Sequence, residues 1–142
     1  MKKITLFILL LTFSIGFSQN APVDFEVGGK GMTWTWTIGE NGSNPPLEIV
    51  SNPNISSPNT SANVAKFSAQ VGGQPWALII NDDIGSFTFD NTNCFVKLMV
   101  RKGIASDVGV KLEVPGGIYK EVVVPNTVTN GDWQELTFDF TS

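Results

Sequence analysis

The sequence predicts an all-β protein, and three observations support this. Apolar and polar residues alternate with a period of two in many short stretches, and no stretch after residue 18 sustains a helical period of about 3.6. Turn-forming clusters such as Pro115-Gly116-Gly117 and Asn130-Gly131 separate these stretches. Val and Phe, which favour strands, are abundant. Nine or ten short strands joined by frequent turns are typical of a β-sandwich or a β-barrel.

In chain order, the clearest strand covers residues 32–38, where the threonines fall on one face and Trp34 and Trp36 share the other face with Met32 and Ile38. We expect the tryptophans to face the core, because the threonine face suits solvent. The same pattern predicts strands at residues 23–27, 47–50, 64–70, 76–80, 87–89, 94–101, 108–114, 118–124 and 133–140.

The loop Pro115-Gly116-Gly117 fixes the register of one hairpin, with Val114 opposite Ile118. Every second residue before Val114 is then apolar and belongs in the core. The opposite face collects four side chains, those of Lys111, Glu113, Tyr119 and Glu121. Such a face suits sugar binding, because an aromatic ring stacks on the apolar C–H face of a pyranose while charged groups hydrogen-bond to its hydroxyls. The alternative is a solvated face with a Lys111–Glu121 ion pair between the strands.

Other aromatic and basic residues are candidates for the same binding surface. On strand 94–101, Lys97 and Arg101 lie on a mixed face that can enlarge it. Trp76 follows a Gly-Gly-Gln-Pro turn, so it either stands at the rim of a groove or packs inside. Trp133 begins the last expected strand and is predicted to anchor the core, because large aromatic side chains dominate core burial.

Residues 1–18 have the features of a secretory signal peptide. The start is positively charged, an apolar run covers residues 4–15, and the small residues Gly16 and Ser18 occupy the −3 and −1 positions. The run is shorter than the about 20 apolar residues that a membrane-spanning helix needs, so no membrane span is expected. The mature chain, residues 19–142, is expected to be one domain that is secreted, periplasmic or at the cell surface.

Composition excludes several functions. Without the leader and its two lysines, seven basic residues stand against thirteen acidic ones, a net charge of −6, so no nucleic-acid partner is expected. The absence of histidine excludes Ser-His-Asp and Cys-His catalytic groups and His-ligated metals. Cys94 is the single cysteine, so it forms no intramolecular disulfide, and we expect its thiol to be buried.

Four segments in this order carry a family resemblance: Asn52-Pro53-Asn54 with residues 59–66, Gly72-Gly73-Gln74-Pro75-Trp76-Ala77, Val110-Lys111-Leu112-Glu113, and Trp133-Gln134-Glu135-Leu136-Thr137-Phe138-Asp139-Phe140. From residue 23 to residue 142 the chain resembles the carbohydrate-binding modules of family 4/9, found beside glycoside hydrolases in secreted bacterial proteins. The resemblance implies a galactose-binding-like jelly-roll β-sandwich with no catalytic role. It also implies a polysaccharide ligand, often a β-glucan, in a groove on one sheet.

The same resemblance implies one or two further strands after Ser142 and an attached glycoside hydrolase domain. It implies a structural calcium ion held by an acidic residue of the first strand, where Glu26 fits, and by one of a late strand, for which Asp139 stands. No other cofactor is expected. Met99 departs from the pattern, because such modules often carry an aromatic ring there.

Three functions remain open on this sequence. The leading one is binding of a polysaccharide, a neutral β-glucan because the mature chain is acidic, through Trp76, Lys97, Arg101, Lys111, Glu113, Tyr119 and Glu121. The second is a glycoside hydrolase that uses Glu113 and Glu121, since paired carboxylates catalyse that reaction without histidine. The third is a structural or adhesive extracellular domain without a sugar ligand, which Met99 favours.

Overall fold

The computed structural model describes residues 22–39, 44–74, 76–86 and 88–141. In these ranges the chain is all-β, as predicted, and forms no helix. The predicted signal peptide, residues 1–18, lies outside the described residues. The strands are β1 (Thr37–Gly39), β2 (Glu48–Ser51), β3 (Asn63–Lys66), β4 (Leu78–Ile80), β5 (Phe95–Val100), β6 (Ser106–Val114), β7 (Ile118–Asn126) and β8 (Gln134–Asp139).

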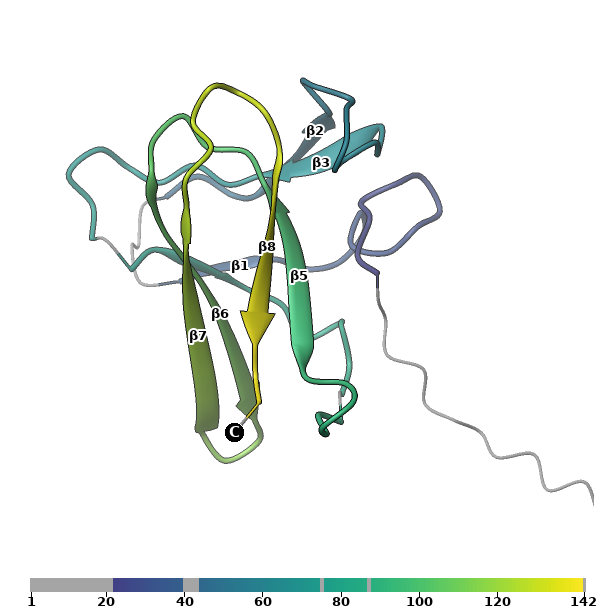
Figure 1. The fold of residues 1–142 in the computed structure, drawn as a ribbon, viewed down its shortest axis with the longest axis vertical. Coiled ribbons are helices and arrows are strands. Elements are labelled where there is room, and N and C mark those ends of the chain that lie inside the picture. Colours follow the sequence, from purple (N-terminus) through teal and green to yellow (C-terminus); the bar gives the residue numbers. More distant parts are fainter. Residues whose placement is uncertain (1–21, 40–43, 75, 87, 142) are drawn as a thin grey trace, which may run out of the picture.

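The described strands pair in twos, all antiparallel: β1 with β4, β2 with β3, β5 with β8, and β6 with β7. Two of these pairs are hairpins of neighbouring strands, whereas β5 and β8 are separated by the whole β6–β7 hairpin. Figure 1 shows the long β6–β7 hairpin beside β5 and β8, with the β2–β3 hairpin at the upper end of these strands.

The core lies where the β5–β8 and β6–β7 pairs meet. Its centre is Leu136 and Phe138 of β8 with Phe140 just beyond, and Phe138 has no exposed surface. Alternating residues of four strands and one loop residue make up this core, and those that pack on its centre are Val96, Val100, Val108, Val110, Leu112, Val122, Val124 and Phe89. Because successive side chains of a strand point to opposite faces, the intervening residues of these strands turn away from the core.

The predicted register of the β6–β7 hairpin is confirmed. Val114 pairs with Ile118, and the next partners bring Glu113 opposite Tyr119 and Lys111 opposite Glu121. The turn is closed by a hydrogen bond from the Gly117 amide to the Val114 carbonyl, at 3.2 Å. Gly116 and Gly117 have φ angles of 105° and 82°, which residues with a Cβ rarely adopt, so the two glycines define the turn.

The prediction of a strand at residues 23–27 is wrong. The Asp24 and Phe25 amides both donate to the Lys30 carbonyl and close a loop. The Asp24 carboxylate accepts hydrogen bonds from the Glu26 and Lys30 amides, at 3.1 and 3.0 Å. Aspartate side chains that bond to nearby backbone in this way compete with strand pairing. Residues 88 and 89 also form no strand, against the prediction for residues 87–89.

The predicted strand at residues 32–38 is paired only over Thr37–Gly39. The side chains nevertheless alternate between solvent and interior in this segment, because Thr35 and Thr37 are exposed and Trp36 between them is half-buried. Trp36 packs against Phe25, with ring centroids 5.7 Å apart, and against Trp34, at 6.0 Å. Its indole N–H donates to the Gly31 carbonyl at 2.9 Å. The two tryptophans therefore belong to a local aromatic cluster, apart from the Phe138 core.

Candidate functional site

The outward face of the β6–β7 hairpin brings together the four side chains predicted from the register. Lys111, Glu113, Tyr119 and Glu121 are all exposed there, and Tyr119 is 59% exposed. They share this face because the inward residues of both strands are the apolar ones that cover the core. The face is open along nine residues of each strand, which gives an extended ligand room to lie along it.

Lys111 organises this face. Its Nζ lies 3.0 Å from Glu113 Oε2 and 4.3 Å from the centroid of the Tyr119 ring. The hydrogen bond that the ammonium donates to Glu113 raises the pKa of Lys111 above 10.5, and the negative charges of Glu113 and Glu121 act in the same direction. The cation, the carboxylate and the ring are therefore held together before any ligand arrives.

Gly109, on the same face, leaves a gap in the row of side chains. The Glu121 Oε1 atom lies 3.0 Å from the position that a Cβ at residue 109 would take. The carboxylate therefore lies over the backbone of β6, and a hydroxyl group that approaches along the strand meets an acceptor there.

The other three predicted ligand-binding residues lie elsewhere. Lys97 of β5 forms an ion pair with Glu135 of β8, at 2.7 Å, on the side of that pair that faces away from the core. The Arg101 Nε donates to the Gly131 carbonyl at 2.6 Å, beyond the end of β5. Trp76 is exposed in the segment before β4. The predicted site is thus divided, and only its hairpin part is assembled on one face.

The two carboxylates proposed for calcium are engaged with hydrogen-bond donors. Glu26 accepts bonds from the Ala62 amide, the Asn63 amide at 3.2 Å and the Asn63 side-chain amide at 2.9 Å. Asp139 accepts a bond from the Thr141 amide at 2.8 Å. Calcium requires several oxygen ligands, and the described residues contain no group of three or more acidic, Cys or His side chains that could hold a metal. Glu26 fastens the N-terminal loop to the start of β3, whereas Asp139 bonds to the residue two positions further along its own strand end.

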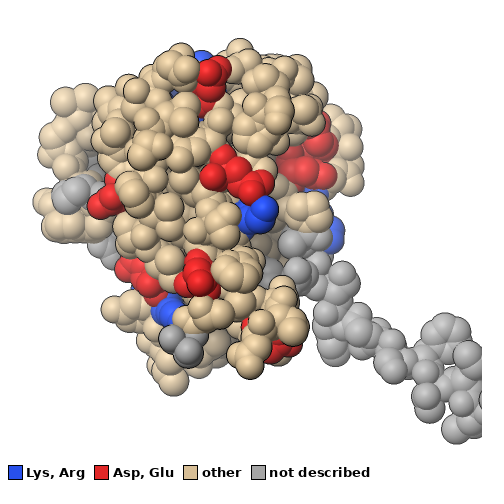
Figure 2. Space-filling view, viewed as in Figure 1, with Lys and Arg blue, Asp and Glu red and all other residues tan. Residues whose placement is uncertain are grey.

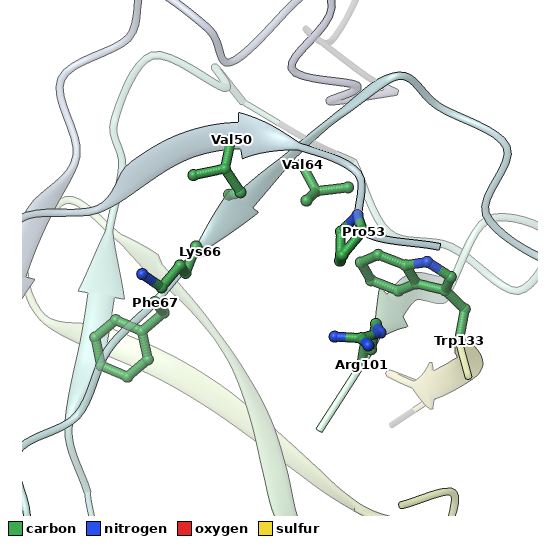
Figure 3. Close-up of a pocket in the computed structure, with 8 residues that line it drawn as sticks. Val50, Pro53, Val64, Lys66, Phe67, Arg101 and Trp133 are labelled. Carbon is green, nitrogen blue, oxygen red and sulfur yellow. The ribbon is translucent and has the colours of Figure 1, made fainter. Parts of the chain in front are cut away.

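A pocket of about 280 Å³ lies at the upper end of β5 and β8, beside the β2–β3 hairpin (Figure 3). Its lining residues come from three distant segments: Val50, Pro53, Val64, Ala65, Lys66, Phe67, Arg101 and Trp133. In Figure 3 the Trp133 ring, Pro53 and the Arg101 guanidinium stand on one side, and Lys66 and Phe67 on the other. No pattern in the sequence indicated this pocket.

Trp133 is held at the wall of this pocket and is only half-buried, so the prediction that it anchors the core is wrong. Its indole N–H donates to the Asn54 carbonyl at 2.8 Å and to the Asn52 Oδ1 at 3.2 Å. Asn52 is buried, and its side-chain amide donates in turn to the Ser61 carbonyl, at 2.8 Å. The turn Asn52-Pro53-Asn54 was the available signal, because Asn side chains in turns satisfy neighbouring polar groups.

Comparisons with known proteins returned no match to a family model, a curated protein or a solved structure. Among the described residues, no helix has the length and apolar character needed to cross a membrane.

Proposed function

We propose that this chain is a secreted, non-catalytic polysaccharide-binding module with a jelly-roll β-sandwich fold, and that the outward face of β6–β7 binds a neutral β-glucan. The observation that carries the proposal is the hairpin register, which gathers an exposed Tyr119 ring with Lys111, Glu113 and Glu121 on one open face. As part of the same proposal, the module works beside a glycoside hydrolase domain.

The chemistry of the face matches the two kinds of surface on a pyranose. The Tyr119 ring offers an apolar surface for the C–H face of the sugar, while Glu113 and Glu121 accept and Lys111 donates hydrogen bonds to hydroxyls. Because Lys111 already contacts both Glu113 and Tyr119, these side chains lose little conformational freedom when a ligand binds.

The charge distribution favours a neutral polymer at this face. Acidic residues outnumber basic ones in the whole chain. On the side of the molecule that Figure 2 shows, the basic side chains of the described residues form no continuous patch. An anionic polymer that lies along β6–β7 would meet two carboxylates, those of Glu113 and Glu121, and one ammonium group, that of Lys111. Repulsion would then exceed attraction.

A structural or adhesive domain without a sugar ligand is the second candidate. The observation that favours it is that the Lys111 ammonium has both Glu113 and the Tyr119 ring as partners on the face itself. The enzyme alternative has less support, because Glu113, one of its two carboxylates, is tied to Lys111 by an ion pair.

Affinity electrophoresis of the chain from Gln19 onward tests the proposal, with gels that contain laminarin, mixed-linkage glucan, xylan or alginate. We expect retardation by a β-glucan, with loss of most of it in Tyr119→Ala and retention in Tyr119→Phe, which keeps the ring. Retardation of equal size in Tyr119→Ala would reject the site. Absence of retardation in every gel would favour the structural domain.

A further inference from the structure

We propose that the pocket between the β2–β3 hairpin and the start of β8 is a second, independent binding site, which takes a glycan chain end that carries a carboxylate, such as a terminal uronate. The pocket is lined by aliphatic side chains, two aromatic rings, the Arg101 guanidinium and the Lys66 ammonium. It shares none of its lining residues with the β6–β7 face, so either site can fail without the other.

The size of the pocket indicates a small ligand. Sites for drug-sized molecules occupy about 300–1,000 Å³, and this pocket, at about 280 Å³, lies just below that range. It therefore has room for one or two sugar rings, as the end of a polysaccharide chain offers.

The walls provide surfaces for the apolar face of a sugar ring. The Trp133 ring and Pro53 stand on one side and Phe67, 37% exposed, stands on the other, while Val50 and Val64 also line the pocket. Stacking of C–H groups on such rings is favourable because it removes apolar surface from water.

The main aromatic wall is preorganised. Both acceptors of the Trp133 indole N–H belong to the turn after β2, and one of them, Asn52, is itself 8% exposed. The Asn52 backbone amide also donates to the Ala62 carbonyl at 2.7 Å, which fixes the turn to the residue just before β3. A ligand therefore meets a ring whose orientation is already set, and little entropy is lost in positioning it.

Arg101 supplies the charge that selects the ligand. Its Nε donates to the Gly131 carbonyl at 2.6 Å, and the guanidinium stands beside the Trp133 ring in Figure 3. Within the described ranges no carboxylate forms an ion pair with Arg101, whereas the other pocket cation, Lys66, is paired with Glu48 at 2.8 Å. The terminal N–H groups of a planar guanidinium match the two oxygens of a carboxylate.

A carboxylate fits better than a phosphate or a neutral group. Lys66 is paired with Glu48, so Arg101 is the pocket cation that can balance one negative charge of the ligand. A second negative charge on the ligand would find no further unpaired cation among the lining residues. A neutral sugar would bring no negative charge to Arg101 and would gain no ion pair there.

The test compares two ligands that differ only at C6, methyl β-D-glucuronide and methyl β-D-glucoside, by ¹H–¹⁵N NMR of the chain from Gln19 onward. We expect the glucuronide to shift the Trp133 indole N–H resonance and the Arg101 signals, and the glucoside to bind at least about tenfold more weakly. Arg101→Gln is expected to weaken glucuronide binding by about tenfold or more, whereas Lys97→Gln, which removes another cation from β5, the strand that ends just before Arg101, leaves it unchanged.

Further variants separate this site from the hairpin face. Tyr119→Ala is expected to leave glucuronide binding intact, and Phe67→Ala to weaken it without loss of the folded spectrum. Equal binding of the two sugars, tighter binding of inorganic phosphate, unchanged affinity in Arg101→Gln, or no shift at the Trp133 indole at saturating glucuronide would each overturn the proposal. None of these outcomes bears on whether a β-glucan gel retards the protein, which is the test of the Tyr119 face.

Discussion

Lys111 of β6 places its ammonium 4.3 Å from the centroid of the Tyr119 ring on β7, one diagonal step across the hairpin. This cation–π contact is attractive because the face of an aromatic ring carries partial negative charge. The same ammonium lies 3.0 Å from Glu113, which stands directly opposite Tyr119. The ring is thus oriented by an ion pair on its own face of the sheet.

The first prediction concerns the ionisation of Lys111. Because the hydrogen bond to Glu113 is the largest cause of its raised pKa, Glu113→Gln should lower that pKa toward 10.5. The stabilisation from this contact is present below pH 10.5 and is lost as the pH rises through the higher pKa of the folded state. NMR titration of the Lys111 side chain measures the change, and an unchanged pKa in Glu113→Gln would show that the ion pair is absent in solution.

The second prediction concerns Trp133. Trp133→Phe keeps most of the ring but removes the indole N–H that bonds to Asn52 and Asn54, so we expect a loss of about 0.5–1.5 kcal/mol of unfolding free energy. Trp133→Ala should cost about 2–3 kcal/mol, because the ring is half-buried and the loss of a fully buried ring costs about 3–5 kcal/mol.

Urea unfolding of the two Trp133 variants gives both values. A loss above about 4 kcal/mol for Trp133→Ala would indicate that the ring is a core residue after all.

The third prediction tests the hairpin turn. Gly116 has a φ of 105°, and a Cβ there would meet no atom within 4 Å, so Gly116→Ala should destabilise by about 1–2 kcal/mol through backbone strain alone. Gly103 is a matched control, since its surroundings are equally open and its φ lies outside the strained region. Thermal unfolding should show no loss for Gly103→Ala, and equal effects of the two substitutions would contradict the turn geometry.

The fourth prediction concerns acid stability. The hydrogen bond from the Thr92 hydroxyl to the Asp90 carboxylate, aided by the Thr92 and Asn93 amides, lowers the pKa of Asp90 below 3.8. A depressed pKa stabilises the fold above pH 3.8, and that effect is lost as the pH falls through the folded-state value.

Asp90→Asn should therefore lower the Tm near neutral pH, and the difference from the parent chain should shrink as the pH falls through the folded-state pKa of Asp90. Asp82→Asn removes an exposed charge from another loop and serves as the control. A constant difference in Tm at all pH values would rule out an electrostatic origin.

Much of the fold was predictable where its determinants are local. The register of β6–β7 follows from alternation on both strands and from a loop with two glycines at positive φ. Residues 23–27 also alternate, yet the Asp24 side chain bonds to nearby amides and closes a loop. The pairing of β5 with β8 depends on contacts between distant segments, which alternation alone does not specify.

The candidate sites divide in the same way. Tyr119 and Glu113 could be placed together because they face each other across one hairpin. The pocket draws Val50, Arg101 and Trp133 from three parts of the chain, so no local pattern indicates it. Trp133 was expected in the core because its size favours burial, whereas the acceptors of its indole N–H come from a distant turn, 79 and 81 residues earlier.

A ¹H–¹⁵N NMR titration with a β-1,3-gluco-oligosaccharide tests the central claim most directly, since it reports which residues the ligand reaches. We predict the largest shifts at the amides of Gly109, Lys111, Glu113, Tyr119 and Glu121, and their loss in Tyr119→Ala. Shifts confined to other residues, or no shifts at saturating ligand, would contradict glucan binding on the β6–β7 face.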